Sequence, residues 1–281
     1  MTEAEARIAE ELRIADPDRY LSVLYAPEGR RPDLFALYAF NAEIAAVRDR
    51  IHEPLPGEVR LQWWRDVIAA GTVEAAGGHP LAAALIRAID THHLPQAAFQ
   101  ACLDARVFDL YDDPMPSRGD LEGYLGETAS VLIQLAALIL DRDAAAAISE
   151  AAGHAGCARG IAGLLQLVPQ HRARGQCLVP RDLLASAGTT PEAFVDGSDR
   201  PAATRALEAM VALGREHWTA YRQSGPVPPS LRPAFQPVAT APDILGAVER
   251  AGAGALDTPA RVSPIRRFWR VFRSGVALRA R

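Results

Sequence analysis

The stretch Leu34-Phe-Ala-Leu-Tyr-Ala-Phe-Asn-Ala-Glu-Ile-Ala-Ala-Val-Arg-Asp-Arg50 determines how the rest of the chain is interpreted. Its apolar residues recur at spacings of three and four, which predicts one long helix that ends near Ile51. Pro32 stands where a first-turn proline is tolerated, and Asp33 follows it at the positive end of the helix dipole. One face of this predicted helix carries Leu34, Leu37, Tyr38, Asn41, Ile44, Ala45 and Arg48.

The composition is that of a globular protein with a large core. The chain has 281 residues, of which 49% are apolar and 23% are charged. Helical periodicity recurs along the chain between proline and glycine breaks, and no segment shows sustained alternation of apolar and polar residues. We therefore expect an all-α fold, with one helical domain over residues 1–262 and a basic amphipathic helix over residues 263–281.

Charge and cysteine content exclude several classes of protein. All 30 basic residues are arginine, and seven of them lie in residues 261–281, which contain no acid. Because the positive charge is confined to this tail, a nucleic-acid partner is not expected. The three widely spaced cysteines show no metal-binding spacing and predict reduced thiols. The acidic N-terminus does not resemble a signal peptide, and no apolar run reaches about 18 residues, so we expect a cytoplasmic protein without a membrane-spanning helix.

Four stretches occur in the order typical of one family. They are Tyr20 to Phe40, ending in Leu37-Tyr-Ala-Phe40; Trp64-Arg65; Asp120-Leu-Glu-Gly-Tyr124; and Gly160 to Leu184, which contains Arg174-Gly-Gln-Cys. Together they span roughly residues 18 to 200 and resemble the squalene/phytoene synthase family. The resemblance implies an isoprenoid-synthase-like helical bundle around a central cavity.

The same resemblance implies a reaction that this chain is poorly equipped to perform. Active members ionise a prenyl diphosphate whose charge is neutralised by Mg²⁺, which carboxylates on facing helices hold. The first aspartate motif aligns with Ala45, Ala46 and Asp49, and the second aligns its aspartates with Leu167 and His171. Only Asp49 retains a carboxylate. We therefore expect no catalytic residue, no cofactor and no metal site, with Asp49 as a Mg²⁺ ligand only if the chain is active.

A non-catalytic branch of the family shares the altered motifs. Phe40-Asn-Ala-Glu-Ile-Ala, Arg60-Leu-Gln-Trp-Trp-Arg65 and Pro169-Gln-His171 are similar to the sequences of that branch, which is associated with assembly of mitochondrial complex I. The resemblance implies a pseudoenzyme that supports assembly of the respiratory NADH dehydrogenase, with complex I subunits or assembly intermediates as partners. Two alternatives stay open: a head-to-head prenyltransferase acting on prenyl diphosphates, and an isoprenoid-lipid carrier.

Several side chains are candidates for binding a prenyl lipid or an anionic head group. Arginine grips phosphate by charge and by paired hydrogen bonds, and a tryptophan can line an apolar cleft. Of the adjacent Trp63 and Trp64, we expect one to lie in the core and the other in such a cleft. Small residues from Gly153 to Gly163 predict either close helix packing or room for a ligand. The candidate ligand-binding residues are Tyr38, Asn41, Trp64, Gln166, Arg172 and Arg174.

The C-terminal helix is the candidate membrane contact. Ser263 is a plausible cap, and aromatic and basic residues alternate after it in a pattern that suits a helix lying on anionic lipid. The candidate membrane-binding residues are Arg266, Arg267, Phe268, Trp269, Arg270, Phe272 and Arg273. They imply a peripheral position on the inner face of the cytoplasmic membrane. In the alternative arrangement, Phe268 and Phe272 pack on the bundle, or the acidic body of the protein holds the basic tail.

Overall fold

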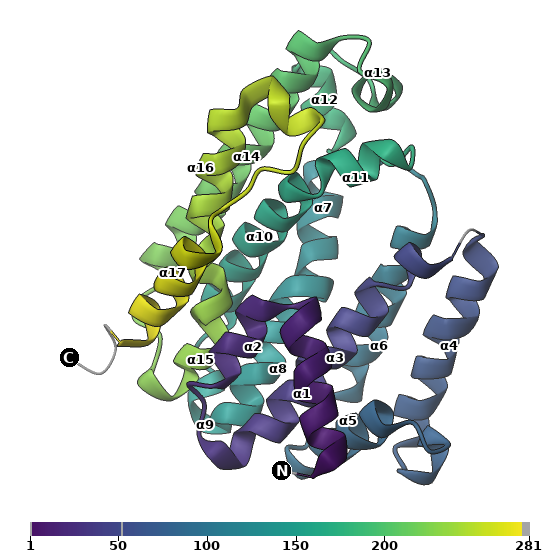
Figure 1. Cartoon of the computed structure of the whole chain (residues 1–281), viewed down its shortest axis with the longest axis vertical. Coiled ribbons are helices and arrows are strands. Elements are labelled where there is room, and N and C mark those ends of the chain that lie inside the picture. Colours follow the sequence, from purple (N-terminus) through teal and green to yellow (C-terminus); the bar gives the residue numbers. More distant parts are fainter. Residues whose placement is uncertain (1, 52, 277–281) are drawn as a thin grey trace.

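The computed structural model describes residues 2–51 and 53–276, and these residues form helices joined by turns, with no β-strand among them. Figure 1 shows the helices side by side as an elongated bundle. In chain order the α-helices are α1 (Glu3–Ala15), α2 (Pro17–Val23), α3 (Arg31–Ala45), α4 (Pro54–Ala70), α5 (Pro80–Thr91), α6 (Gln96–Val107), α7 (Arg118–Leu125), α8 (Val131–Leu140), α9 (Arg142–Ala145), α10 (Ser149–Gln166), α11 (Val168–Ala173), α12 (Arg181–Ser186), α13 (Pro191–Asp196), α14 (Arg200–Gln223), α15 (Arg232–Phe235), α16 (Ala241–Ala251) and α17 (Pro264–Val276).

The helix α3 is buried on all sides. Every residue from Leu34 to Phe40 is less than 9% exposed, and so are Asn41 and Ile44. The prediction of a single buried face was therefore too narrow, because α1, α5, α6 and α8 all pack on α3. Such an all-round apolar helix is typical of the centre of a bundle.

The predicted end of this helix was wrong. The helix stops at Ala45, and the chain then makes a short 3₁₀ turn, η2 (Arg48–Arg50). Arg48 and Asp49 leave the helix direction and form ion pairs with Asp112 and Arg174, which lie far away in the sequence. These tertiary pairs favour the turn over a further turn of helix.

A long helical run begins after Ser117. Ser117 caps α7, and α7 continues through a π-helical turn, η5 (Gly126–Ser130), into α8. The run Arg118–Leu140 is long and apolar enough to cross a membrane by length and composition, which the absence of a long uninterrupted apolar run had not suggested. In this bundle, however, 56% of its most apolar window is buried by the surrounding helices.

The glycines of α10 permit a close approach to this run. A Cβ on Gly156 would lie 2.5 Å from the backbone nitrogen of Ser130, and one on Gly160 would lie 2.5 Å from Leu125 Cδ2. Close packing is therefore the role of these two glycines, whereas Gly153 faces open space. As expected from Pro169, α10 ends at Gln166, and α11 begins with that proline in its first turn.

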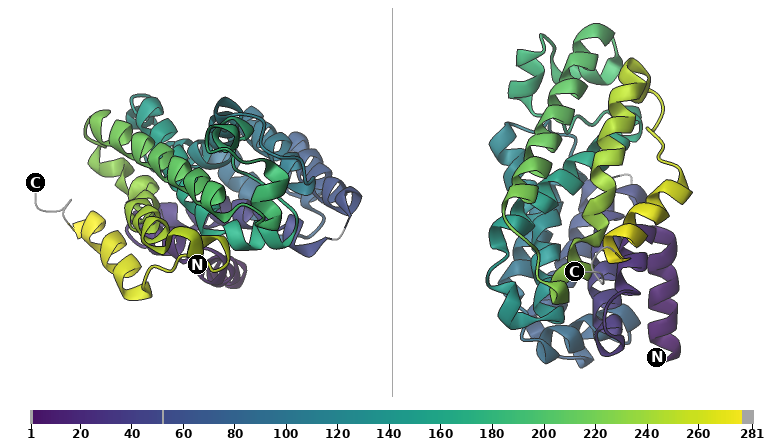
Figure 2. Two further views of the ribbon diagram at one scale, coloured as in Figure 1. Left: turned by 90° about the horizontal axis from the view of Figure 1, so that it is seen from above. Right: turned by 90° about the vertical axis from the view of Figure 1, so that its left-hand side faces the viewer.

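The buried apolar side chains form two clusters. The first draws on α1, α3 to α6 and α8, and the second draws on α7, α10 to α14 and α16. The helix α10 contributes alanines to the first cluster and Cys157, Ile161 and Leu165 to the second. Viewed from the side, α17 lies against the same edge of the bundle as α1 and α2 (Figure 2).

Candidate functional site

The two altered motifs meet at the surface between η2 and α11. Arg174 Nη1 donates a hydrogen bond to Asp49 Oδ1 at 2.5 Å, although 125 residues separate the two side chains. His171, on the same helix end, lies near enough for the charges of Asp49, Arg174 and Asp109 to affect its pKa. The sequence-predicted Asp49, His171 and Arg174 are thus brought together.

A buried polar cluster lies near this surface. Arg106 Nη1 donates to Asp109 Oδ2 and to the Tyr124 hydroxyl, both at 2.9 Å, and the Tyr124 hydroxyl donates to Asp109 Oδ1 at 2.7 Å. Burial alone would lower the pKa of Arg106. The neighbouring Tyr124 and Asp109 raise this pKa by more than burial lowers it, so the guanidinium stays charged. Gln176 donates to the backbone oxygens of Asp109 and Tyr111 and fixes the segment after α11 to this cluster.

The residues present do not fit a magnesium cluster. Bound Mg²⁺ would neutralise the leaving diphosphate, and it needs several oxygen ligands in octahedral geometry. Within residues 2–51 and 53–276, no three side chains of His, Cys, Asp or Glu are grouped so that they could hold a metal. The Asp49 carboxylate is occupied by Arg174, and the second motif offers Leu167, which is 43% exposed.

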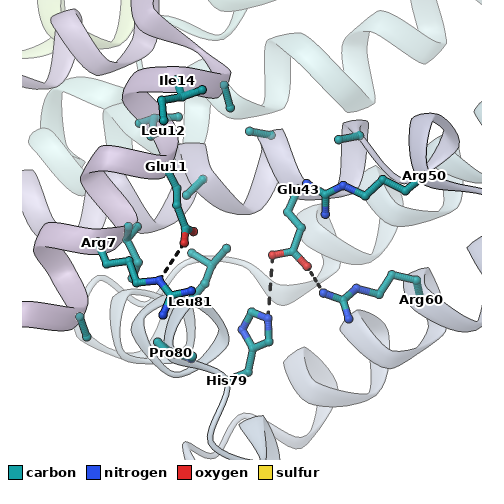
Figure 3. A pocket seen from close by; sticks show the side chains of 16 residues that line it. Arg7, Glu11, Leu12, Ile14, Glu43, Arg50, Arg60, His79, Pro80 and Leu81 are labelled. Carbon is teal, nitrogen blue, oxygen red and sulfur yellow. Dashed lines mark hydrogen bonds and ion pairs between the residues drawn. The ribbon is translucent and has the colours of Figure 1, made fainter.

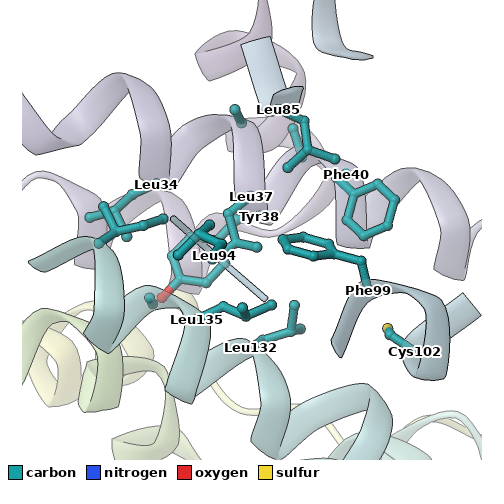
Figure 4. Close-up of a cluster of buried hydrophobic side chains, with 14 of the residues drawn as sticks. Leu34, Leu37, Tyr38, Phe40, Leu85, Leu94, Phe99, Cys102, Leu132 and Leu135 are labelled. Carbon is teal, nitrogen blue, oxygen red and sulfur yellow. The ribbon is translucent and has the colours of Figure 1, made fainter. Parts of the chain in front are cut away.

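The interior beside Tyr38 is filled rather than hollow. Figure 4 shows Tyr38 among Leu34, Leu37, Leu132 and Leu135. The hollow next to its ring measures about 10 Å³, the room of about one water molecule at most. The central cavity implied by the resemblance is therefore closed by side chains at this point.

Two of the candidate ligand-binding residues are buried with unused polar atoms. Asn41 Oδ1 and Trp64 Nε1 have no hydrogen-bond partner among the described residues. Trp64 is fully buried and packs edge-on against Phe40 at 4.9 Å between ring centroids. It is the core member of the tryptophan pair although it was predicted to bind a ligand, and its neighbour Trp63 is partly buried.

Gln166 and Arg172 tie helices together instead of facing a hollow. Gln166 Nε2 donates to the Ala260 oxygen at 3.2 Å. Arg172 donates to the backbone oxygens of Phe194 at 2.9 Å and Leu256 at 2.6 Å, and it also pairs with Asp257. These contacts occupy the guanidinium of Arg172, so it is not available to bind a phosphate, contrary to the prediction.

A pocket of about 570 Å³ lies on another side of α3, between α1, α4 and α5. Figure 3 shows Glu43 pointing toward Arg60 and His79 across this pocket. The Glu43 side chain is only 14% exposed and accepts a short hydrogen bond from Arg60. Glu43 is not among the site residues predicted from the sequence, since it shares no helix face with Asp49. The signal that could have indicated it is the Asn41-Ala-Glu43 pattern of the non-catalytic branch.

His79 has a defined orientation in this pocket. Its Nδ1 accepts a hydrogen bond from the backbone N–H of Ala82 at 3.3 Å and so caps α5. The proton of the neutral ring therefore lies on Nε2, which is 4.0 Å from Glu43 Oε2. This gap is too long for a direct hydrogen bond.

The predicted C-terminal helix forms, but its orientation corrects the membrane assignment. Arg267 pairs with Asp18 at 2.6 Å, and Arg270 makes two hydrogen bonds to Asp243. Both acids are nearly buried, because their side chains are 3% and 5% exposed. Arg267 and Arg270 therefore hold α17 on the bundle and are not lipid contacts.

The aromatic side of α17 points outward. Ile265 is 70% exposed, Phe268 is 47% exposed and Trp269 is 52% exposed. Phe272 is partly buried, but the exposure of Phe268 and the pairing of the arginines contradict the alternative in which both phenylalanines dock on the bundle while the arginines are solvated. The other alternative, an acidic body holding the basic tail, describes Arg266, Arg267 and Arg270.

The lowered pKa of His171 leads to a prediction about how the stability of the fold depends on pH. Burial lowers this pKa, and Asp109 and Asp49 offset only part of the effect. Because the unfolded state binds the proton more readily, stability is fully present above about pH 6.5 and falls as the pH drops through that value. Thermal unfolding of His171→Gln should show a weaker loss of stability between about pH 7.5 and pH 5.5 than the parent chain. An identical pH dependence in both proteins would contradict this.

Comparisons with known proteins agree with the sequence resemblance. The model of the squalene/phytoene synthase family matches residues 12–268. The human NADH dehydrogenase (ubiquinone) complex I assembly factor 6 is 32% identical over 185 residues, which are 66% of this chain and 55% of that protein. The mouse protein of the same name is 29% identical over 85% of this chain and 72% of its own length. A presqualene diphosphate synthase of Zymomonas mobilis is 28% identical over 60% of this chain and 58% of its own length.

Solved structures show the same fold. A dehydrosqualene synthase superposes with a TM-score of 0.78 at 17% identity, covering 99% of this chain and 98% of its own. A squalene synthase of Alicyclobacillus acidocaldarius superposes with a TM-score of 0.70 at 21% identity, covering 89% and 94% of the two chains. The helical bundle is thus an isoprenoid-synthase fold. Since the family model spans nearly the whole chain, this protein belongs to the squalene/phytoene synthase family.

Proposed function

We propose that this protein is a non-catalytic member of its family that supports assembly of a respiratory NADH dehydrogenase. The observation that carries the proposal is the ion pair between Asp49 and Arg174. In this pair, the one carboxylate left at the metal-binding positions binds an arginine that lies three residues after the second motif. Similarity to complex I assembly factor 6 is the reason for proposing a role in assembly.

The arrangement of charge argues against diphosphate chemistry. Ionising a prenyl diphosphate needs its charge neutralised at the moment the bond breaks. Near the motif positions, Asp49 and Asp112 each already pair with an arginine, and Asp109 is held within the buried cluster. An isoprenoid carrier would in turn need a tunnel, and the interior beside Tyr38 is packed.

The exposed aromatic side of α17 supports a peripheral position on a membrane. Tryptophan and phenylalanine on one side of a helix insert into the boundary of a lipid layer, where basic neighbours contact head groups. Arg273 is exposed on the same helix and suits that contact, whereas Arg266 is paired with Asp243. We propose the inner face of the cytoplasmic membrane as the place of action, with complex I subunits or assembly intermediates as partners.

A rescue experiment tests the role and the absence of catalysis together. A strain that lacks this gene should lose NADH dehydrogenase activity in its membranes, and the gene should restore it. Because no reaction is required, Asp49→Asn should restore it as well. Normal activity in the deletion strain would refute the assembly role.

An enzyme assay provides the second arm. The purified full chain is incubated with Mg²⁺ and farnesyl or geranylgeranyl diphosphate, and released diphosphate is measured. We expect no release above the rate without protein. Release that disappears in Asp49→Asn would instead establish the prenyltransferase alternative.

A further inference from the structure

A second pocket, which no part of the proposed function uses, lies between the end of α14, α15, η7 (Gln236–Thr240) and α17. Its volume is about 870 Å³, within the range of ordinary ligand sites. We call it the α14–α17 pocket. It is separate from the motif positions, because Asp49, His171 and Arg174 do not line it.

The lining of the α14–α17 pocket is basic. Among the described residues, four arginines line it, namely Arg222, Arg232, Arg270 and Arg273, and no carboxylate does. Asp243 neutralises Arg270 from outside the lining. Arg222 and Arg273 are both exposed, and neither forms an ion pair with any residue of the described ranges. In a chain whose formal net charge is −4, this concentration of positive charge points to an anionic ligand.

One wall of the pocket is aromatic. Tyr221 stacks on Phe235 with 5.7 Å between ring centroids and an interplanar angle of 6°, and Trp218 packs against Tyr221 at 5.6 Å. Such a wall gives an apolar chain a surface to lie on. A ligand that satisfies both parts of the pocket is therefore an amphiphile with an anionic head.

A buried amide supplies an independent sign of a polar ligand. Gln236 lines the pocket, is 3% exposed, and its Oε1 has no hydrogen-bond partner among the described residues. A buried amide oxygen without a donor is costly, so native structures rarely keep one without a use. Because this oxygen accepts hydrogen bonds, it suits a hydroxyl of a head group, whereas the arginines suit the phosphate oxygens.

The position of the pocket selects among phosphate-bearing molecules. It is lined partly by α17, through Arg270, Arg273 and Ser274, and other positions of the same helix, namely Ile265, Phe268 and Trp269, are exposed. A helix that presents such residues lies at a membrane surface, where phospholipid head groups are at hand. We propose that the α14–α17 pocket binds the phosphate head group of an anionic phospholipid. This inference rests on the membrane contact proposed above but not on the assembly role.

Vesicle binding of the purified full chain tests the proposal. Vesicles of phosphatidylcholine with and without phosphatidylglycerol are sedimented, and bound protein is measured. We expect binding that needs phosphatidylglycerol and that the double substitution Arg222→Ala/Arg273→Ala weakens about thirtyfold, at about fivefold for each arginine near the surface.

The matched control removes the same charge elsewhere. Arg87→Ala/Arg181→Ala replaces two exposed arginines that do not line the pocket, and its binding should stay within about threefold of the parent. Equal losses in the two double variants would overturn the pocket and leave only general attraction to anionic lipid. If the parent chain fails to bind either vesicle, the membrane contact itself is refuted.

Two further measurements test whether weaker binding reflects unfolding, and whether the ligand is a lipid head group or a soluble phosphate. Gln236→Leu removes an amide oxygen that lacks a partner, so thermal unfolding should be unchanged or occur at higher temperature while vesicle binding weakens. A lower unfolding temperature with unchanged binding would contradict the role of Gln236. Inorganic phosphate is added as a competitor, and saturation of the pocket by phosphate alone at concentrations that abolish vesicle binding would assign it to a soluble phosphate instead.

Discussion

Replacing Gly156 with valine should destabilise the protein by about 3 kcal/mol or more, among the largest effects of any single substitution in the chain. A Cβ at this position would lie 2.5 Å from the backbone nitrogen of Ser130. The obstacle is backbone within the π-helical turn between α7 and α8, so no side-chain rotation relieves it. Urea unfolding followed by circular dichroism measures the change.

The same helix offers a control for this substitution. A Cβ on Gly153 would meet nothing within 4 Å. Gly153→Ala should therefore stabilise α10 by about 0.5 to 1 kcal/mol through helix propensity alone. If Gly156→Val and Gly153→Ala changed stability equally, the close approach of α10 to the π-helical turn would be refuted.

Replacing Arg106 with methionine should cost about 3 to 5 kcal/mol. The side chain is 14% exposed and donates to both Asp109 and Tyr124. Removing its charge leaves the Asp109 carboxylate, 17% exposed, without a cation in the interior. The same unfolding measurement applies.

Two companion variants distinguish loss of the ion pair from loss of packing. Tyr124→Phe removes one hydroxyl from the cluster and should cost only about 1 kcal/mol. Arg106→Met/Asp109→Asn should be more stable than Arg106→Met alone, because the second change removes the unpaired charge. A double variant that loses stability additively would show that the cluster does not act as a unit.

The sequence was sufficient for the bundle and for its main packing features. The apolar run around Phe40 predicted the central helix, and the cap at Ser117 and the proline at position 169 are local signals of the same kind. Features of this kind depend on neighbours within a turn or two of helix, which a single sequence contains.

The contacts that define the sites depend on distant residues. Asp49 meets Arg174 across 125 positions, and Arg267 meets Asp18 across 249 positions. Nothing in the periodicity of α17 distinguishes arginines that pair with buried acids from arginines that face solvent. The predicted polarity of that helix was therefore only partly right, and Glu43 was not among the predicted site residues although it lies in a pocket with Arg60 and His79.

The pair between Arg267 and Asp18 has a consequence for synthesis of the protein. Asp18 lies on α2, near the beginning of the chain, and is 2% exposed in the folded bundle. Chains emerge from the ribosome N-terminus first, so Asp18 on α2 is synthesised long before its partner Arg267 on α17. In the folded bundle Arg159 Nη2 also lies 3.5 Å from Asp18 Oδ2, so both cations that pair with this buried acid come from later helices. The ion pairs that neutralise Asp18 can therefore form only late in synthesis, after α10 and α17 have been made.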